Sequence, residues 1–71
     1  MSEFLITGEY IELHRLLKAA KLCGTGGEAK LVIDEGIVAV DGEIDTRLRR
    51  KVRDGMTVKF NGKEITVRAG E

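Results

Sequence analysis

Residues 25–36 have the sequence TGGEAKLVIDEG, which contains the start, the apolar face and the end of one helix. Thr25 and Glu28 have the spacing of a capping box, in which each side chain satisfies a free backbone N–H of the other residue. The apolar stripe that follows at helical spacing is Ala29, Val32 and Ile33. Gly36 can end the helix, because glycine adopts a left-handed conformation at little cost. The stretch therefore predicts a helix over about residues 26–35.

A second amphipathic helix is predicted upstream, from about Glu9 to Leu22, with Gly24 as its C-terminal cap. Its apolar positions are Leu13, Leu16, Leu17 and Ala20, with Tyr10 one turn earlier. The cysteine Cys23 is expected to be a small apolar filler at the helix end. An optional first strand is expected around residues 4–6.

Downstream of Gly36 the apolar period changes to two, beginning with Val38 and Val40. Asp41-Gly42 and Asn61-Gly62 are both tight-turn signals. A two-residue turn at Asn61-Gly62 predicts three facing pairs, which are Val58 with Ile65, Met56 with Val67, and Lys59 with Glu64. The predicted fold class is α+β, with two helices packed on a small antiparallel sheet in one domain over residues 1–71.

Composition excludes several classes of protein. Seventy-one residues can bury only one core, and the hydrophobic fraction of 42% is too high for a disordered chain. No run approaches the roughly 20 apolar residues of a membrane helix, and the start does not resemble a secretory signal. The single cysteine allows no internal disulfide. We expect a cytoplasmic protein without a membrane partner, most simply a monomer.

Residues 47–53, RLRRKVR, carry five cations and no acid, and we call them the basic segment. If the segment is extended, one face carries Arg47, Arg49, Lys51 and Arg53, and the other carries Leu48, Arg50 and Val52. Same-face cations would lie about 6.6 Å apart. That spacing is within the screening length of roughly 8 Å at physiological salt, so their fields reinforce one another. The alternative is a solvated edge that prevents aggregation between strands.

The net charge of the chain is zero, so only the distribution of charge can indicate an anionic partner. Acidic residues are concentrated near the start and between residues 34 and 45. The two predicted helices add four cations, which are Arg15, Lys18, Lys21 and Lys30. A dipolar molecule of this kind would have one basic face that binds phosphate.

A set of motifs at particular distances resembles a known family. The motifs are Thr25-Gly26-Gly27-Glu28-Ala29-Lys30, Ile33, Gly36, Val38, Val40, Asp41-Gly42-Glu43, Thr46-Arg47 and Asp54-Gly55. They resemble the S-four domain of ribosomal small-subunit protein four, also called the alpha-L fold, and more closely its small stand-alone bacterial relatives. The resemblance runs from about Ile11 to Phe60. It implies binding of structured RNA through the two helices and the adjoining hairpin.

The resemblance also concerns single positions. Lys30 falls where the family usually has a basic residue on the second helix, and this implies an RNA contact. Glu12-Leu13-His14 departs from the family's Arg-Leu-Asp, and Gly26 stands where the family usually has arginine. Gly26 and Gly27 leave a helix N-terminus open, where backbone N–H groups could receive a phosphate. Alternatively, these glycines only permit close helix packing.

No arrangement of residues indicates catalysis or a cofactor. His14 is the one histidine and has no cysteine at metal-ligand spacing. The acids of residues 34–35 and 41–43 suit a helix end and a turn better than acid–base chemistry. We therefore expect neither an enzyme nor a metal protein.

The expected partner is structured RNA, ribosomal or transfer, with the ribosome or a subunit as a possible target. With three aromatic residues in the chain, Phe4, Tyr10 and Phe60, base stacking is poorly supplied and phosphate contacts should dominate. The candidate contact residues are Lys18, Lys21, Gly26, Gly27, Lys30, Arg47, Arg49, Arg50, Lys51 and Arg53. The rival hypothesis is a protein-interaction adaptor that docks the same basic edge on an acidic partner.

Overall fold

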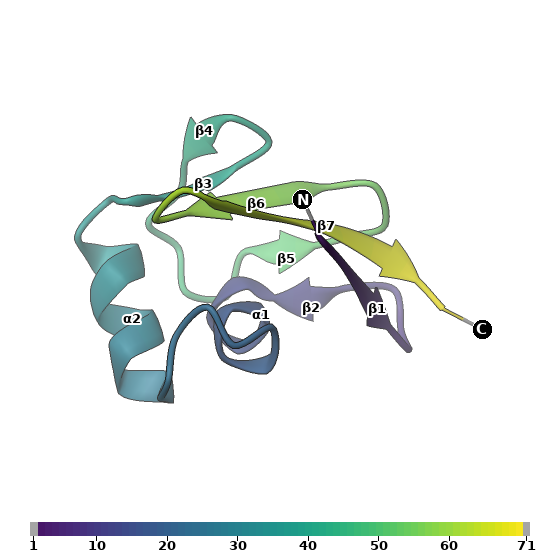
Figure 1. Cartoon of the computed structure of the whole chain (residues 1–71), viewed down its shortest axis with the longest axis horizontal. Coiled ribbons are helices and arrows are strands. Elements are labelled where there is room, and N and C mark those ends of the chain that lie inside the picture. Colours follow the sequence, from purple (N-terminus) through teal and green to yellow (C-terminus); the bar gives the residue numbers. More distant parts are fainter. Residues whose placement is uncertain (1, 71) are drawn as a thin grey trace.

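The structure is a computed structural model that describes residues 2–70, and it has two helices and two sheets (Figure 1). The elements in chain order are β1 (Ser2–Ile6), β2 (Ile11–Glu12), α1 (Leu13–Ala19), α2 (Gly26–Asp34), β3 (Val38–Val40), β4 (Glu43–Ile44), β5 (Lys51–Val52), β6 (Thr57–Phe60) and β7 (Lys63–Ala69). The helices lie together below the larger sheet in the view of Figure 1. The predicted α+β class is confirmed.

The larger sheet has the strand order β1-β7-β6-β3-β4, and its strands are not all antiparallel. The expected first strand forms as β1, but it pairs in parallel with β7, with Phe4 opposite Val67. The prediction of a purely antiparallel sheet was therefore wrong at this edge. A parallel pair needs a long connection, and almost the whole chain lies between these two strands.

The Asn61-Gly62 hairpin forms as predicted. Asn61 and Gly62 both have positive φ, 54° and 78°, as a type I′ turn requires. Val58 lies opposite Ile65, and Lys59 lies opposite Glu64. The backbone N–H of Val67 donates to the Met56 carbonyl at 2.8 Å, and the Val67 carbonyl accepts from the N–H of Gly55 at 2.8 Å. Two residues thus oppose Val67, and Gly55, with a φ of 88°, is the first residue of a glycine-type β-bulge.

The helix α2 begins and ends where the sequence predicts. The Thr25 Oγ1 accepts from the N–H of Glu28 at 3.1 Å, and Gly36 follows the helix with a φ of 75°. One detail of the capping box was wrong, because the Glu28 Oε1 accepts from the N–H of Gly24 at 2.7 Å instead of that of Thr25. The acid thereby ties the preceding loop to the helix start.

The helix α1 is shorter at both ends than predicted. Its expected start at Glu9 was wrong, because residues 11–12 form β2 and pair with β5. At its other end Lys21, with a φ of 62°, takes the left-handed conformation that was assigned to Gly24. Lys21 closes the helix, since its N–H donates to the Lys18 carbonyl at 3.0 Å.

One hydrophobic core lies between the helices and the sheet. The fully buried side chains include Leu13, Leu16, Leu17, Ile33, Val38, Val52, Val58 and Val67. Cys23 is also buried, as expected for an apolar filler, and this burial raises the pKa of its thiol. Neither helix in residues 2–70 combines the length and the apolar character needed to span a membrane.

The positive φ of Gly62 yields a first prediction. Replacing Gly62 with alanine should lower the free energy of unfolding by about 1–2 kcal/mol, because an L-residue is strained in the left-handed region. A Cβ at this position meets no atom within 4 Å, so the strain is in the backbone alone. Urea denaturation measures the change.

The matched control is Gly26→Ala, at the start of α2. A Cβ there also meets nothing within 4 Å, and the φ of Gly26 is not positive. Stability should stay the same or rise by about 0.4–1 kcal/mol. If Gly62→Ala and Gly26→Ala lowered the free energy of unfolding equally, the left-handed conformation assigned to Gly62 would be contradicted.

Candidate nucleic-acid interface

The basic segment is only partly a strand. Arg47 to Arg50 form a turn, in which the N–H of Arg50 donates to the Arg47 carbonyl at 3.3 Å, and only Lys51 and Val52 form β5. The segment is therefore not continuously extended, which was the condition stated for its two faces. The two faces nevertheless differ in burial: the exposed side chains are Arg47, Arg49, Lys51 and Arg53, whereas Leu48, Arg50 and Val52 are partly or fully buried.

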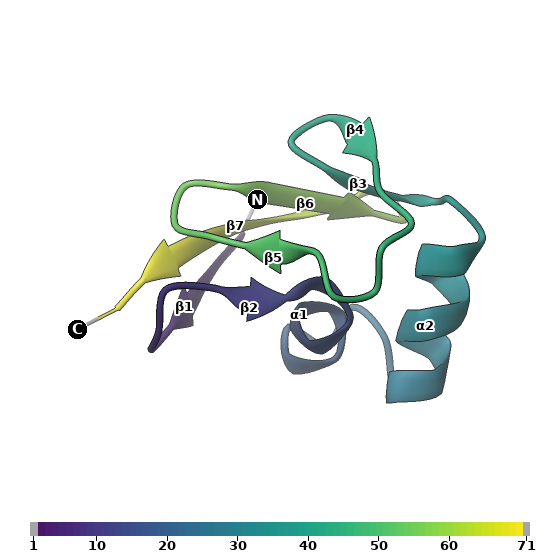
Figure 2. The same ribbon diagram turned by 180° about the vertical axis from the view of Figure 1, so that it is seen from behind.

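The backbone of residues 11–14 holds the basic segment in place. In β2 and β5, Ile11 pairs with Val52 and Glu12 pairs with Lys51. The first N–H groups of α1 also donate to this segment, from Leu13 to the Arg50 carbonyl at 2.9 Å and from His14 to the Leu48 carbonyl at 3.1 Å. Figure 2 shows β5 beside β2, and β2 leads directly into α1. The backbone that carries these cations is thus hydrogen-bonded to β2 and to the start of α1.

Asp45 neutralises part of the basic segment. Arg47 donates through Nε to Oδ1 at 3.0 Å and through Nη2 to Oδ2 at 2.8 Å, and the Arg50 Nε lies 3.1 Å from Oδ2. The expectation that the acids lie away from the cations was therefore wrong for Asp45. The hydrogen bond from the Arg47 side chain lowers the pKa of Asp45. The hydrogen bond from the Arg47 N–H and the positive charges of Arg47 and Arg50 act in the same direction, and the pKa falls to about 2.

The remaining cations of the segment lie beside an aromatic ring. The Lys51 Nζ is 5.0 Å from the centre of the Tyr10 ring, and the Arg53 Cζ is 5.6 Å from it. Tyr10 was expected on the first helix, but it precedes β2 and is 40% exposed. It lines a groove of about 440 Å³ together with Ile11, Glu12, Arg15 and Arg49.

Lys30 lies on the exposed face of α2 beside the start of the basic segment. It shares a groove of about 390 Å³ with Gly27, Leu31, Asp34, Thr46 and Leu48. The structure therefore brings α2 next to the segment, as the resemblance implied. A Cβ at Gly26 would meet nothing within 4 Å, and one at Gly27 would only approach the Thr25 Oγ1 at 3.9 Å. Close helix packing is thus not what requires glycine at these positions.

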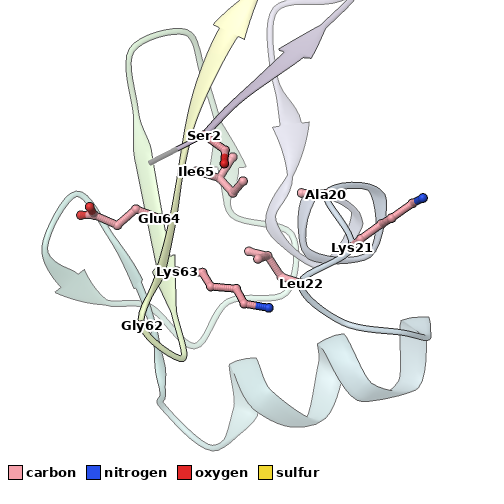
Figure 3. Close-up of a pocket in the computed structure, with 8 residues that line it drawn as sticks. All are labelled: Ser2, Ala20, Lys21, Leu22, Gly62, Lys63, Glu64 and Ile65. Carbon is pink, nitrogen blue, oxygen red and sulfur yellow. The ribbon is translucent and has the colours of Figure 1, made fainter.

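Lys21 lies elsewhere. It lines a hollow with Leu22 and the turn between β6 and β7, where Lys63 extends toward Leu22 and Lys21 points away (Figure 3). The structure does not place Lys21 with the basic segment. Lys18 is exposed on α1, three residues after Arg15 and therefore on the same side of the helix.

The side chain of His14 contacts that of Glu12. Its Nε2 lies 3.0 Å from the Glu12 Oε1. In residues 2–70 no three side chains of histidine, cysteine, aspartate or glutamate are gathered as a metal site would require.

The fold and this basic surface define a class of protein: the chain belongs to the S4 domain family, whose pattern matches residues 4–68. Among its relatives is the YbcJ protein of Escherichia coli strain K12, which is named as a proposed RNA-binding protein. The two are 43% identical over 58 residues, covering 82% of this chain and 83% of that protein. An uncharacterised YbcJ protein of Shigella flexneri matches to the same extent.

A solved structure agrees with the fold. The solution structure of Escherichia coli YbcJ is described as revealing an αL motif involved in RNA binding. It has a TM-score of 0.76 and 40% identity to this chain, and the match covers 97% of this chain and 89% of that one. The expected S-four family and αL fold are confirmed.

The ion pairs of Asp45 predict a pH dependence. Because the pKa of Asp45 falls from 3.8 to about 2 on folding, its carboxylate stabilises the fold above about pH 4, and this stabilisation is lost as the pH falls toward 2. Asp45→Asn should therefore unfold at lower urea concentration than the wild type at pH 7, with a difference that shrinks as the pH falls from about 4 to 2.

Asparagine is the appropriate replacement because it can still accept the backbone hydrogen bond from Arg47, which is 3.0 Å long. Asn61→Ala, in the β6–β7 turn, is a control whose effect on stability should not vary over this pH range. A constant difference between Asp45→Asn and the wild type from pH 7 to pH 2 would contradict the assigned ion pairs.

Proposed function

We propose that this chain is an RNA-binding protein that contacts structured RNA, ribosomal or transfer, with little sequence specificity. The observation that carries the proposal is the anchoring of the basic segment to β2 and α1, next to the groove that contains Lys30. Membership of the S4 domain family and the RNA-related descriptions of its YbcJ relative support it.

Three exposed cations of the basic segment lie outside the ion pairs that Asp45 forms with Arg47 and Arg50. On the larger sheet two of the three cations have acidic neighbours, since Arg68 Nε lies 3.1 Å from the Glu3 Oε2 and Lys59 lies opposite Glu64, whereas Lys63 lies opposite Phe60. Among residues 2–70, no ion pair is formed by Arg49, Lys51 or Arg53. A chain with zero net charge can therefore present one uncompensated positive surface to phosphates.

The mode of recognition follows from these groups. Lysine and arginine side chains on phosphates hold an RNA in register but carry no direct sequence information. A rigid array of such cations selects the geometry of an RNA backbone. We propose that the chain binds RNA as a monomer and does not catalyse a reaction. Its cytoplasmic localisation stays a prediction.

Removing exposed cations tests the proposal. Replacing Lys30, Arg49 and Lys51 together with glutamine should lower the slope of log affinity against log salt by about 2 to 3 units, roughly one unit for each phosphate contact. The fold should survive, because exposed charge substitutions usually change stability by only about 0.5 kcal/mol. The measurement is filter binding to a structured ribosomal RNA fragment at several salt concentrations.

The chain offers a control with the same change in net charge. Lys59, Lys63 and Arg68 are exposed on β6 and β7, and replacing all three with glutamine should leave the slope nearly unchanged. Equal slopes for the two folded triple variants would contradict the assigned face. If the wild type binds an acidic protein that the RNA fragment does not displace, the adaptor hypothesis replaces this one.

A further inference from the structure

Tyr10 stands at the junction of two surface grooves. One is the groove that it forms with Ile11, Glu12, Arg15 and Arg49. The other, of about 320 Å³, also contains Tyr10, Ile11 and Arg15, and it is otherwise lined by residues 4–8. Tyr10 and Arg15 thus belong to both, and an elongated ligand that follows the grooves must pass the ring.

The role of the Tyr10 ring is not explained by the core. The ring belongs to a side chain that is 40% exposed, and Tyr10 is not part of the buried cluster. Within residues 2–70, its hydroxyl makes no hydrogen bond to another side chain. Lys51 and Arg53 lie over the ring at 5.0 and 5.6 Å, and this cation–π contact orients it. Tyr10 is thus a partly exposed aromatic side chain in contact with two cations, and a base that stacks on it either uses a ring face that they leave open or displaces them.

The cations around Tyr10 are placed to hold phosphates. Arg15 on α1 and Arg49 of the basic segment line the same groove and are both exposed. The acid in this groove, Glu12, lies 3.0 Å from the His14 Nε2. A ring for a base, flanked by guanidinium groups for the adjoining phosphates, is the combination by which proteins hold single-stranded nucleotides.

We propose that Tyr10 is the stacking platform of a subsite for one unpaired RNA nucleotide, with its phosphates held by Arg15 and Arg49. The inference rests on the proposed function and adds a substrate class to it, namely structured RNA with a bulged or looped-out nucleotide. A base within a duplex is already stacked on both faces, so the ring can reach only a base that is splayed out. The cations of the basic segment then contact the phosphate backbone of the duplex part of the RNA.

The test compares two RNA hairpins with the same stem, one fully paired and one with a single bulged 2-aminopurine. The wild type should bind the bulged hairpin roughly tenfold more tightly, because stacking on one aromatic ring contributes on this order. The fluorescence of the 2-aminopurine should fall on binding, as stacking quenches it. Tyr10→Leu should reduce the preference to about twofold or less, and Tyr10→Phe should retain it.

A second variant distinguishes loss of the nucleotide subsite from loss of the contact between the Tyr10 ring and the cations Lys51 and Arg53. Arg15→Gln leaves the ring and the basic segment intact, and it should weaken the bulged hairpin more than the paired one. Circular dichroism checks that each variant is folded. The fluorescence change in the wild type needs no variant, so it tests the stacking even if Tyr10→Leu fails to fold.

The outcomes distinguish the two proposals. Equal affinity of the wild type for both hairpins, or an equal loss for both in Tyr10→Leu, overturns the subsite and leaves the RNA-binding function standing. A wild type that binds neither hairpin at low salt overturns both.

Discussion

The contact between the start of α1 and the basic segment is the constraint on which the rest of the structure depends. A helix leaves its first N–H groups without partners, and a polar residue before the helix usually supplies one. Glu12 provides no such side-chain hydrogen bond. The carbonyls of Leu48 and Arg50 accept from His14 and Leu13 instead. One set of hydrogen bonds therefore both starts the first helix and fixes the backbone from which the cations extend, so the fold and the candidate site cannot be separated.

This arrangement divides the cations into two groups. Arg47 and Arg50 lie against Asp45, and their ion pairs hold the turn that leads into β5. Arg49, Lys51 and Arg53 are exposed, and two of them lie over Tyr10. The first group shapes the segment, and the second is exposed on the surface proposed to contact RNA. Neutral overall composition is compatible with a phosphate-binding surface because structure, not composition, decides which charges are cancelled.

Features contained in a few consecutive residues could be predicted from the sequence. The Asn61-Gly62 turn, the Thr25 cap and the Gly36 stop each depend on local backbone preferences, and all three were confirmed. The start of α1 could not be predicted, because its cap comes from carbonyls distant in the chain. For the candidate site, alternation in residues 47–53 predicted which side chains are exposed, but not the turn or the Asp45 ion pairs. Tyr10 was missed because helical periodicity assigned it to α1, whereas the pairing of residues 11–12 with β5 ends the helix before it reaches Tyr10.

The departure of this chain from the S-four pattern at residue 12 acquires a physical meaning in the folded structure. Glu12 stands where the resemblance implies arginine, and it lies in the groove beside Tyr10, Arg15 and Arg49. Two cations to one acid still leave the groove positive, and the proximity of His14 to Glu12 draws that acid toward α1. The positive charge is thus supplied by Arg15, in the first turn of α1, and by Arg49 of the basic segment instead of by residue 12. A phosphate bound between Arg15 and Arg49 would therefore lie in the groove that the Tyr10 ring also lines, as the proposed stacking of its base requires.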